Sequence, residues 1–493
     1  MAGLTLTTAV SAMGTAPTAA AAEAAAAPAR WRACAEPAPQ QAPLQCTTIS
    51  VPLDHRIPHG PKIDIAVSRL AARDQAERRG VLLINPGGPG IAGLGAPALV
   101  SGNPALKDVA EHYDLVGFDP RGTGASSPID CGLDDRQVRQ AQLPWPQPGG
   151  FDADAALARA TAQACVRRAG AMLPHLTTEN TARDIDAIRS MLGERKISYL
   201  GVSYGTYLGA VYATLFPTRV DKLVLDSVMA PEGPSYRTVR STAQAVDARF
   251  TDLAAWLAER HATYSLGETE HQVRARILAL LRRLAKQPEK VGDVEVTPAS
   301  LRSLLYMTFA APDASLFPDT AGVVGYLTGA PGAPPEATVA QRLARATMVP
   351  PTGSATASAM LAVTCAGRWP RDPAAYRRDS LSEARAFPVT GGGLSNIRPC
   401  AYWPGAPGQG QVPRIGGRPV EVLMLQNLRD PVTPYAGAVR MRLALGARTR
   451  LVTVDAAGHG VADLCAVSAA SAWLVDGTLP REDVRCPGRS KAT

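Results

Sequence analysis

Residues 197–206, Ile-Ser-Tyr-Leu-Gly-Val-Ser-Tyr-Gly-Thr, decide the fold of this 493-residue chain. The apolar run at residues 197–200 predicts a buried strand, and residues 206–216 predict a helix directly after it. Between them stands Gly201-Val-Ser-Tyr-Gly205, whose two glycines permit a strained turn from strand to helix. Such a turn lifts a serine hydroxyl above the edge of a sheet. Ser203 is therefore a candidate nucleophile, and the strand and helix around it carry more weight than the pentapeptide alone.

Strand and helix patterns alternate outward from this segment. The strand patterns are short and apolar, and they lie at residues 47–51, 63–70, 81–84, 115–118, 197–200, 223–225, 420–426 and 449–454. The first two are separated by a Pro/Gly-rich turn and predict an antiparallel pair. Helical patterns at residues 181–192 and 206–216 lie between later strands. This alternation predicts an α/β fold with a mostly parallel sheet flanked by helices.

The strand patterns stop in the middle of the chain. From about residue 231 to residue 388 helical periodicity dominates, at residues 239–259, 273–286, 298–309 and 339–346. One sheet interrupted by an inserted helical cap explains this order. We expect an N-terminal core part at residues 31–231, the cap at 232–388 and a C-terminal core part at 389–493.

The charge of the chain does not indicate a nucleic-acid partner. The net charge is +8 and the pI near 9.1, but the basic residues are scattered. Their densest stretch, residues 274–290, alternates with leucines at helical spacing and predicts an amphipathic helix with a solvated basic face. No stretch holds eighteen consecutive apolar residues, so we expect no membrane span.

The cysteines and the N-terminus favour export. Residues 1–30 have an apolar start and an Ala-rich run, typical of a signal peptide without its basic start or of a disordered Ala-rich leader. Eight cysteines without a Cys-x-x-Cys pair fit a disulfide framework formed in an oxidising compartment. The simplest pairing joins sequence neighbours: Cys34 with Cys46, Cys131 with Cys165, Cys365 with Cys400, and Cys465 with Cys486. We expect a secreted protein.

A serine nucleophile needs a base, and the base needs an acid to orient it. Four of the seven histidines precede Ser203 and two lie in the expected cap, whereas His459 follows a late strand between two glycines. Asp430 also directly follows a strand, in Gln426-Asn-Leu-Arg-Asp-Pro-Val-Thr-Pro434. Asp455 is too close to His459 along the chain to orient it, and Asp463 comes after it. The order Ser203, Asp430, His459 is that of an α/β-hydrolase catalytic triad.

A tetrahedral intermediate also needs donors for its oxyanion. Asn85-Pro-Gly-Gly-Pro-Gly90 follows the strand at residues 81–84, where this fold places a Gly-rich loop. We expect the backbone N–H groups of Gly88 and Tyr204 to be the donors. The loop lacks the Gly-Lys-Ser/Thr ending of a phosphate cradle, and the chain has no His-Glu-x-x-His motif. We therefore expect no cofactor and no metal.

Nearly the whole chain after Trp31 resembles the secreted tripeptidyl aminopeptidase branch of the prolyl-aminopeptidase-like α/β-hydrolases. The matching stretches, beside the segments around Asp430 and His459, are Asn85-Pro-Gly-Gly-Pro-Gly90, Asp114-Leu-Val-Gly-Phe-Asp-Pro-Arg-Gly-Thr-Gly124, Ala182-Arg-Asp-Ile-Asp-Ala-Ile-Arg189, Gly201-Val-Ser-Tyr-Gly-Thr206 and Cys400-Ala-Tyr-Trp-Pro404. The resemblance implies a serine exopeptidase that releases short peptides, often tripeptides, from a free N-terminus. It also implies that acidic cap groups anchor the substrate ammonium.

Two positions depart from the family pattern. Ala92 replaces a serine after the Gly-rich loop, and Gly367 replaces an acidic residue two positions after the first cap cysteine. The second change removes an expected ammonium anchor, for which Asp313, Asp319 or Asp372 could substitute. The main prediction is an aminopeptidase acting on peptides as a monomer. A carboxylesterase with the same triad is the alternative, because fold and triad do not select amide over ester. A non-catalytic binding protein is the third reading.

Overall fold

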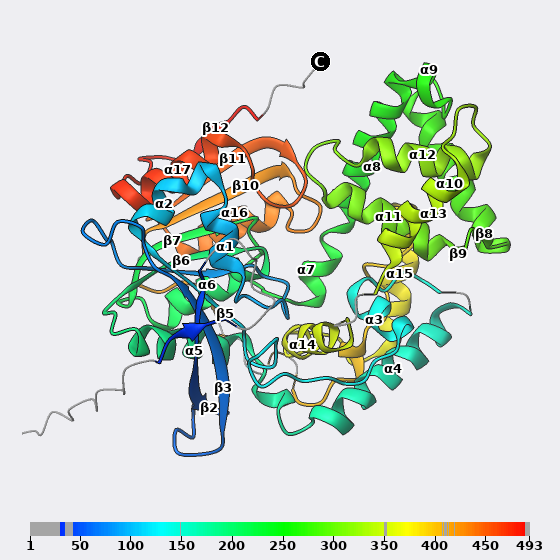
Figure 1. The fold of residues 1–493 in the computed structure, drawn as a ribbon. Helices are drawn as coiled ribbons and strands as arrows, with labels where there is room; N and C mark the ends of the chain where they lie inside the picture. Colours follow the sequence, from blue (N-terminus) through cyan, green and yellow to red (C-terminus); the bar gives the residue numbers. More distant parts are fainter. Residues whose placement is uncertain are drawn as a thin grey trace, which may run out of the picture.

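The computed structural model describes residues 30–34, 43–147, 149–349, 353–406, 408, 412, 414–418 and 420–488. The leader expected at residues 1–30 lies outside these residues, apart from Arg30. Figure 1 shows an α/β lobe built around a twisted sheet and, beside it, a lobe built mainly of helices. No helix in the described ranges combines the length and apolar character that a membrane span requires.

The sheet of the α/β lobe has the strand order β1-β2-β3-β5-β4-β6-β7-β10-β11-β12. Its strands are β1 (Arg32–Ala33), β2 (Gln45–Pro52), β3 (Lys62–Leu70), β4 (Val81–Asn85), β5 (Asp114–Phe118), β6 (Ile197–Val202), β7 (Val220–Asp226), β10 (Val422–Arg429), β11 (Thr449–Ala457) and β12 (Val484–Cys486). The strands from β5 to β12 in this order run parallel, whereas β2 and β3 form the expected antiparallel pair with Ile49 opposite Ile65. The predicted fold class is confirmed.

Helices cover both faces of the sheet, because the parallel strands are apolar on both sides. One face carries α5 (Thr178–Met191), α6 (Tyr204–Leu215) and α16 (Tyr435–Leu445), whose buried residues share a core cluster with β6 and β10. The other face carries α1 (Ala96–Ser101), α2 (Lys107–His112) and α17 (Leu464–Asp476) in a second cluster. This two-sided packing fixes the strand ends that present the candidate site.

The helical lobe has two cores. The first packs α8 (Ala243–Glu259), α10 (Glu270–Lys286), α11 (Pro298–Ala310), α12 (Phe317–Thr328) and α13 (Glu336–Thr347), with the hairpin β8 (Glu289–Val291) and β9 (Val294–Val296) beside them. The second packs α3 (Asp135–Gln142) and α4 (Gly150–Ala169) against α14 (Gly353–Cys365), α15 (Pro373–Ala386) and η3 (Pro399–Tyr402). The short helices α7 (Tyr236–Arg240) and α9 (His261–Tyr264) complete the lobe in Figure 1.

The helical lobe thus draws on more of the chain than the expected cap. Residues 131–176 were assigned to the N-terminal core part, yet α3 and α4 pack with cap helices. Residues 394–403 also pack there, and the sheet resumes only at Val422. The weak apolar periodicity of the Ala-rich α4 gave no signal for this packing. The domain boundaries given above remain a prediction.

All four disulfides join the predicted neighbours. They are Cys34–Cys46, Cys131–Cys165, Cys365–Cys400 and Cys465–Cys486, with Cα–Cα distances of 4.8, 4.5, 4.7 and 6.0 Å. The first links the residue directly after β1 to β2, and the last links α17 to β12 at the opposite edge of the sheet. The other two lie within the second core of the helical lobe.

Candidate active site

Ser203 stands at a strained backbone turn. It follows β6 and precedes α6, with φ 58° and ψ −123°. Such a conformation in a non-glycine residue costs on the order of 1–3 kcal/mol and persists only where the surroundings enforce it. Here the Ser203 N–H donates to the Asp226 carbonyl at 2.9 Å, and the Ser203 carbonyl accepts from Thr206 Oγ1 at 2.6 Å. The side chain of Ser203 remains partly exposed at the carboxyl edge of the sheet.

The two glycines of the pentapeptide are required by close backbone approach. A Cβ on Gly201 would lie 2.4 Å from the Gly205 carbonyl oxygen. A Cβ on Gly205 would lie 2.6 Å from the carbonyl oxygen of Asn85 at the end of β4. Both distances are far below van der Waals contact. The sequence pattern around Ser203 therefore reflects the tight passage of the chain between neighbouring strands.

Asp430 and His459 are brought together although 29 residues separate them. Asp430 directly follows β10 and His459 lies two residues after β11, its parallel neighbour. His459 Nδ1–H donates to Asp430 Oδ2 at 2.9 Å. The Asp430 side chain is fully buried, whereas that of His459 is 21% exposed. The sheet order places β6, which leads to Ser203, two strands away from β10.

The Asp430 side chain accepts hydrogen bonds from four donors. Oδ1 accepts the backbone N–H groups of Val432 and Thr433 at 2.8 and 2.9 Å. Oδ2 accepts the Thr433 hydroxyl at 2.8 Å and the imidazole at 2.9 Å. Burial lowers the pKa of His459, but the hydrogen bond and charge of Asp430 and the charge of Asp226 outweigh it, so that pKa is raised. An imidazole with a raised pKa is a stronger base.

The backbone on both sides of His459 is anchored. Asn427 Nδ2 donates to the carbonyls of Gly458 and Gly460 at 3.1 and 3.0 Å. The His459 N–H donates to the Ala310 carbonyl at the end of α11, at 2.8 Å. The loop that carries His459 therefore contacts the helical lobe directly, so contacts with both lobes fix the position of the imidazole.

Comparison with known proteins shows the family of this chain. A family model described as "alpha/beta hydrolase fold" matches residues 80–463, which include Ser203, Asp430 and His459. The chain belongs to the α/β-hydrolase family. It is 38% identical to a tripeptidyl aminopeptidase of Streptomyces lividans over 95% of this chain and 88% of that protein. Serine protease Hip1 of Mycobacterium tuberculosis is 29% identical over 93% and 91%, and carboxylesterase B of the same species is 31% identical over 92% and 89%.

These matches show a serine hydrolase of the tripeptidyl aminopeptidase type, as the resemblance implied. In α/β-hydrolases the loop after the strand that corresponds to β4 supplies an oxyanion donor. Here Gly87 lies against the turn at Ser203, because a Cβ on it would lie 3.2 Å from the Tyr204 nitrogen. The Gly87 N–H donates a hydrogen bond to Asn85 Oδ1 at 3.1 Å. Tyr204 is the first residue of α6, where N–H groups have no acceptor within the helix.

The other aspartates considered as the acid have different partners. Asp455 pairs with Arg429 at 3.0 Å and is 40% exposed. Asp463 caps α17 by accepting the N–H of Cys465 at 3.0 Å. Among the described residues, neither carboxylate forms a hydrogen bond or an ion pair with the imidazole of His459. The geometry therefore favours Asp430.

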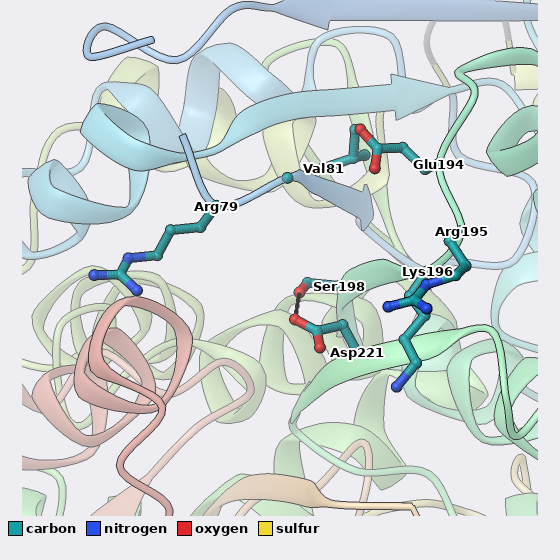
Figure 2. A pocket seen from close by; sticks show the side chains of 8 residues that line it. Arg79, Val81, Glu194, Arg195, Lys196, Ser198 and Asp221 are labelled. Atoms are coloured by element: carbon teal, nitrogen blue, oxygen red, sulfur yellow. Dashed lines mark hydrogen bonds between the residues drawn. The ribbon is translucent and has the colours of Figure 1, made fainter. Parts of the chain in front are cut away.

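A polar pocket lies at the other edge of the sheet. Figure 2 shows its lining, which comes from the amino-terminal ends of β4, β6 and β7 and the turn before β6: Arg79, Gly80, Val81, Glu194, Arg195, Lys196, Ser198 and Asp221. Ser203 and Asp430 follow the carboxyl ends of strands in the same sheet, and His459 lies in the loop after a third strand. The pocket thus lies at the amino-terminal ends of the strands, and the candidate active site lies at their carboxyl ends.

Sequence reasoning missed the side chains that support the candidate triad. Thr433 contacts both Asp430 and His459, with its Oγ1 3.3 Å from His459 Nδ1. Thr433 and Asn427 both stand in the segment that suggested Asp430, so their polarity next to a buried strand was an available signal. Asp226, which ends β7, and Ser227, which follows it, belong to no motif, so no sequence pattern singles them out.

Proposed function

We propose that this protein is a secreted serine exopeptidase that hydrolyses peptide bonds near a free N-terminus and releases short peptides, with tripeptides as the main product. The observation that carries the proposal is the hydrogen-bonded pair of Asp430 and His459 at the sheet edge that also presents Ser203. The similarity to the Streptomyces tripeptidyl aminopeptidase supports the choice of a peptide substrate. The four disulfides support export to an oxidising environment.

In the proposed reaction, neutral His459 takes the proton of the Ser203 hydroxyl as its oxygen attacks the scissile carbonyl. The buried carboxylate of Asp430 stabilises the imidazolium that forms. The backbone N–H groups of Gly88 and Tyr204 bind the oxyanion. His459 then donates its proton to the leaving amine, which leaves an acyl-enzyme on Ser203. Water, deprotonated by His459, hydrolyses the ester and restores the enzyme.

Among the acidic cap groups expected to bind the substrate ammonium, we propose Asp313. Asp319 is paired with Arg342 at 2.6 Å, and Asp372 caps α15 by accepting the Ala374 N–H at 2.9 Å. Asp313 is exposed, and no ion pair of its carboxylate occurs among the described residues. Its N–H donates to the Ala457 carbonyl at 3.1 Å, which places it beside the loop that carries His459.

The test is a panel of chromogenic tripeptides with free and with acylated N-termini, together with short acyl esters. Fast cleavage of the free tripeptides alone is expected. Equal cleavage of free and acylated peptides would overturn the exopeptidase assignment. Turnover of esters only would favour the alternative, a carboxylesterase, for which the 31% identity to carboxylesterase B of Mycobacterium tuberculosis is the supporting observation.

Two variants separate the mechanism from the specificity. Ser203→Ala is expected to abolish activity and covalent labelling by a fluorophosphonate, and retained labelling would contradict the assigned nucleophile. Asp313→Asn is expected to raise KM for free tripeptides while leaving ester hydrolysis unchanged. Asp319→Asn is the matched control, because it removes the same charge from a residue already paired with Arg342.

A further inference from the structure

Asp226, the last residue of β7, and Ser227, which follows it, connect the backbone of the proposed nucleophile to the backbone of the proposed base. The Asp226 carbonyl accepts the Ser203 N–H at 2.9 Å. The Ser227 hydroxyl accepts the Gly460 N–H at 2.8 Å, directly after His459. Asp226 Oδ1 accepts the N–H of Val461, the next residue, at 3.1 Å. β7 lies between β6 and β10 in the sheet, so this link crosses the site.

The backbone of Ser227 indicates that its hydroxyl is needed. Ser227 has φ 56°, a left-handed conformation that glycine adopts freely and other L-residues disfavour. Its side chain is fully buried, and its Oγ donates to Asp226 Oδ1 at 2.9 Å while accepting from Gly460. A glycine would remove the backbone strain but would leave the Gly460 N–H without this acceptor.

We propose that Asp226 and Ser227 are positioning residues that hold the His459 loop in register with Ser203. The Ser227 hydroxyl and the Asp226 carboxylate fix two consecutive N–H groups after the imidazole, and the Asp226 carbonyl fixes the nucleophile turn. Neither side chain touches the reacting atoms. This inference rests on the triad assigned under the proposed function but not on the choice between peptide and ester substrates.

Ser227→Gly tests the proposal, because it relieves the strained backbone while removing the hydroxyl. We expect the melting temperature to stay the same or rise. We expect kcat to fall about tenfold to a hundredfold with little change in KM, since a misplaced base slows the chemical step rather than binding. Wild-type kcat in a folded Ser227→Gly protein would overturn the proposal.

Ser265→Gly is the matched control. Ser265 has φ 53° at the end of α9 in the helical lobe, so the same substitution relieves the same kind of strain. Its carbonyl accepts from Arg276, and that contact does not depend on its side chain. We expect a similar change in melting temperature and unchanged kcat. An equal loss of kcat in this variant would show that relieved strain alone, and not the lost hydroxyl, slows the enzyme.

A second variant, Asp226→Asn, removes a charge while nearly keeping the shape of the side chain. The Asp226 charge contributes to the raised pKa of His459, so the acid limb of the pH–rate profile is expected to move to lower pH. If Asp226 had a purely structural role, Asp226→Asn would lower the melting temperature and leave the acid limb where it is in the wild type. An unmoved limb together with unchanged kcat would contradict the proposal.

The rate of fluorophosphonate labelling is the common readout for all variants, because it reports activation of Ser203 without a peptide or ester preference. The labelling rate should follow kcat in each variant. If Ser203→Ala were still labelled, the triad of the proposed function would fail. If Ser203→Ala were not labelled but Ser227→Gly and Asp226→Asn were labelled at the wild-type rate, the positioning role would fail and the triad would stand.

Discussion

Asp430→Asn is the sharpest test of the assigned base and acid. All four contacts of the Asp430 carboxylate come from donors, at 2.8 to 2.9 Å. An amide presents an N–H₂ group in place of one oxygen, so at least one donor faces another donor. If the amide nitrogen faces His459, the imidazole takes the wrong tautomer, with its proton on Nε2. The variant also loses the negative charge that stabilises the imidazolium.

The expected loss is large. Replacing the acid of a Ser-His-Asp triad by its amide lowers kcat by about 10⁴, which corresponds to about 5.5 kcal/mol of transition-state stabilisation. The assay is steady-state hydrolysis of the best substrate of the panel at the pH optimum. Asp455→Asn is the control, because it removes the same charge from a partly exposed residue paired with Arg429. Its kcat should stay within about twofold of wild type. More than a tenth of wild-type kcat in Asp430→Asn, or an equal loss in Asp455→Asn, would refute the assignment.

Three further predictions follow from the contacts. His459 must be neutral to act as a base and its pKa is raised, so the acid limb of the kcat/KM profile should lie above pH 6.5. A limb below that value would contradict the role of the Asp430 and Asp226 carboxylates. Gly205→Ala places a Cβ 2.6 Å from the Asn85 carbonyl and should cost about 1–3 kcal/mol of stability and abolish fluorophosphonate labelling; normal labelling would contradict the tight turn. Asp184→Ala leaves the fully buried Arg121 guanidinium without its ion pair. We expect it to lower the free energy of unfolding, measured in urea titrations, by about 3–5 kcal/mol. Asp186→Ala, which breaks the partly exposed ion pair with Arg189, is the control and should cost less.

The sheet could be predicted from the sequence because its strands are buried on both faces. Runs such as residues 81–84 and 115–118 are apolar throughout, and the helices between them have a regular period. The edge strands β1 and β12 have two and three residues and gave no pattern. The helices α3 and α4 were missed for a different reason. Their burial depends on α14 and η3, which lie far away in the sequence, and no local pattern encodes such a partner.

The candidate site was accessible to sequence reasoning only where the backbone imposes a residue type. Gly201 and Gly205 must be glycines because any Cβ there would clash with the backbone. Asp430 and His459 follow strands whose ends can be recognised in the sequence. The link made by Asp226 and Ser227 is different. It depends on the register of β7 between β6 and β10, and an aspartate and a serine at a strand end are too common to suggest it.

We expect specificity to come from the helical lobe, because α/β-hydrolases with different substrates share the sheet and the arrangement of nucleophile, acid and base. In this chain the lobe is not remote from the chemistry. The end of α11 accepts the His459 N–H, and Asp313, three residues after Ala310, donates its N–H to Ala457. Arg249, whose side chain is 2% exposed, holds this segment by donating to the carbonyls of Phe309 and Asp313. A substrate that contacts residues 310–313 therefore contacts the segment that positions the base. Under the proposed role of Asp313, substrate binding and the placement of His459 would both depend on the same short stretch of chain.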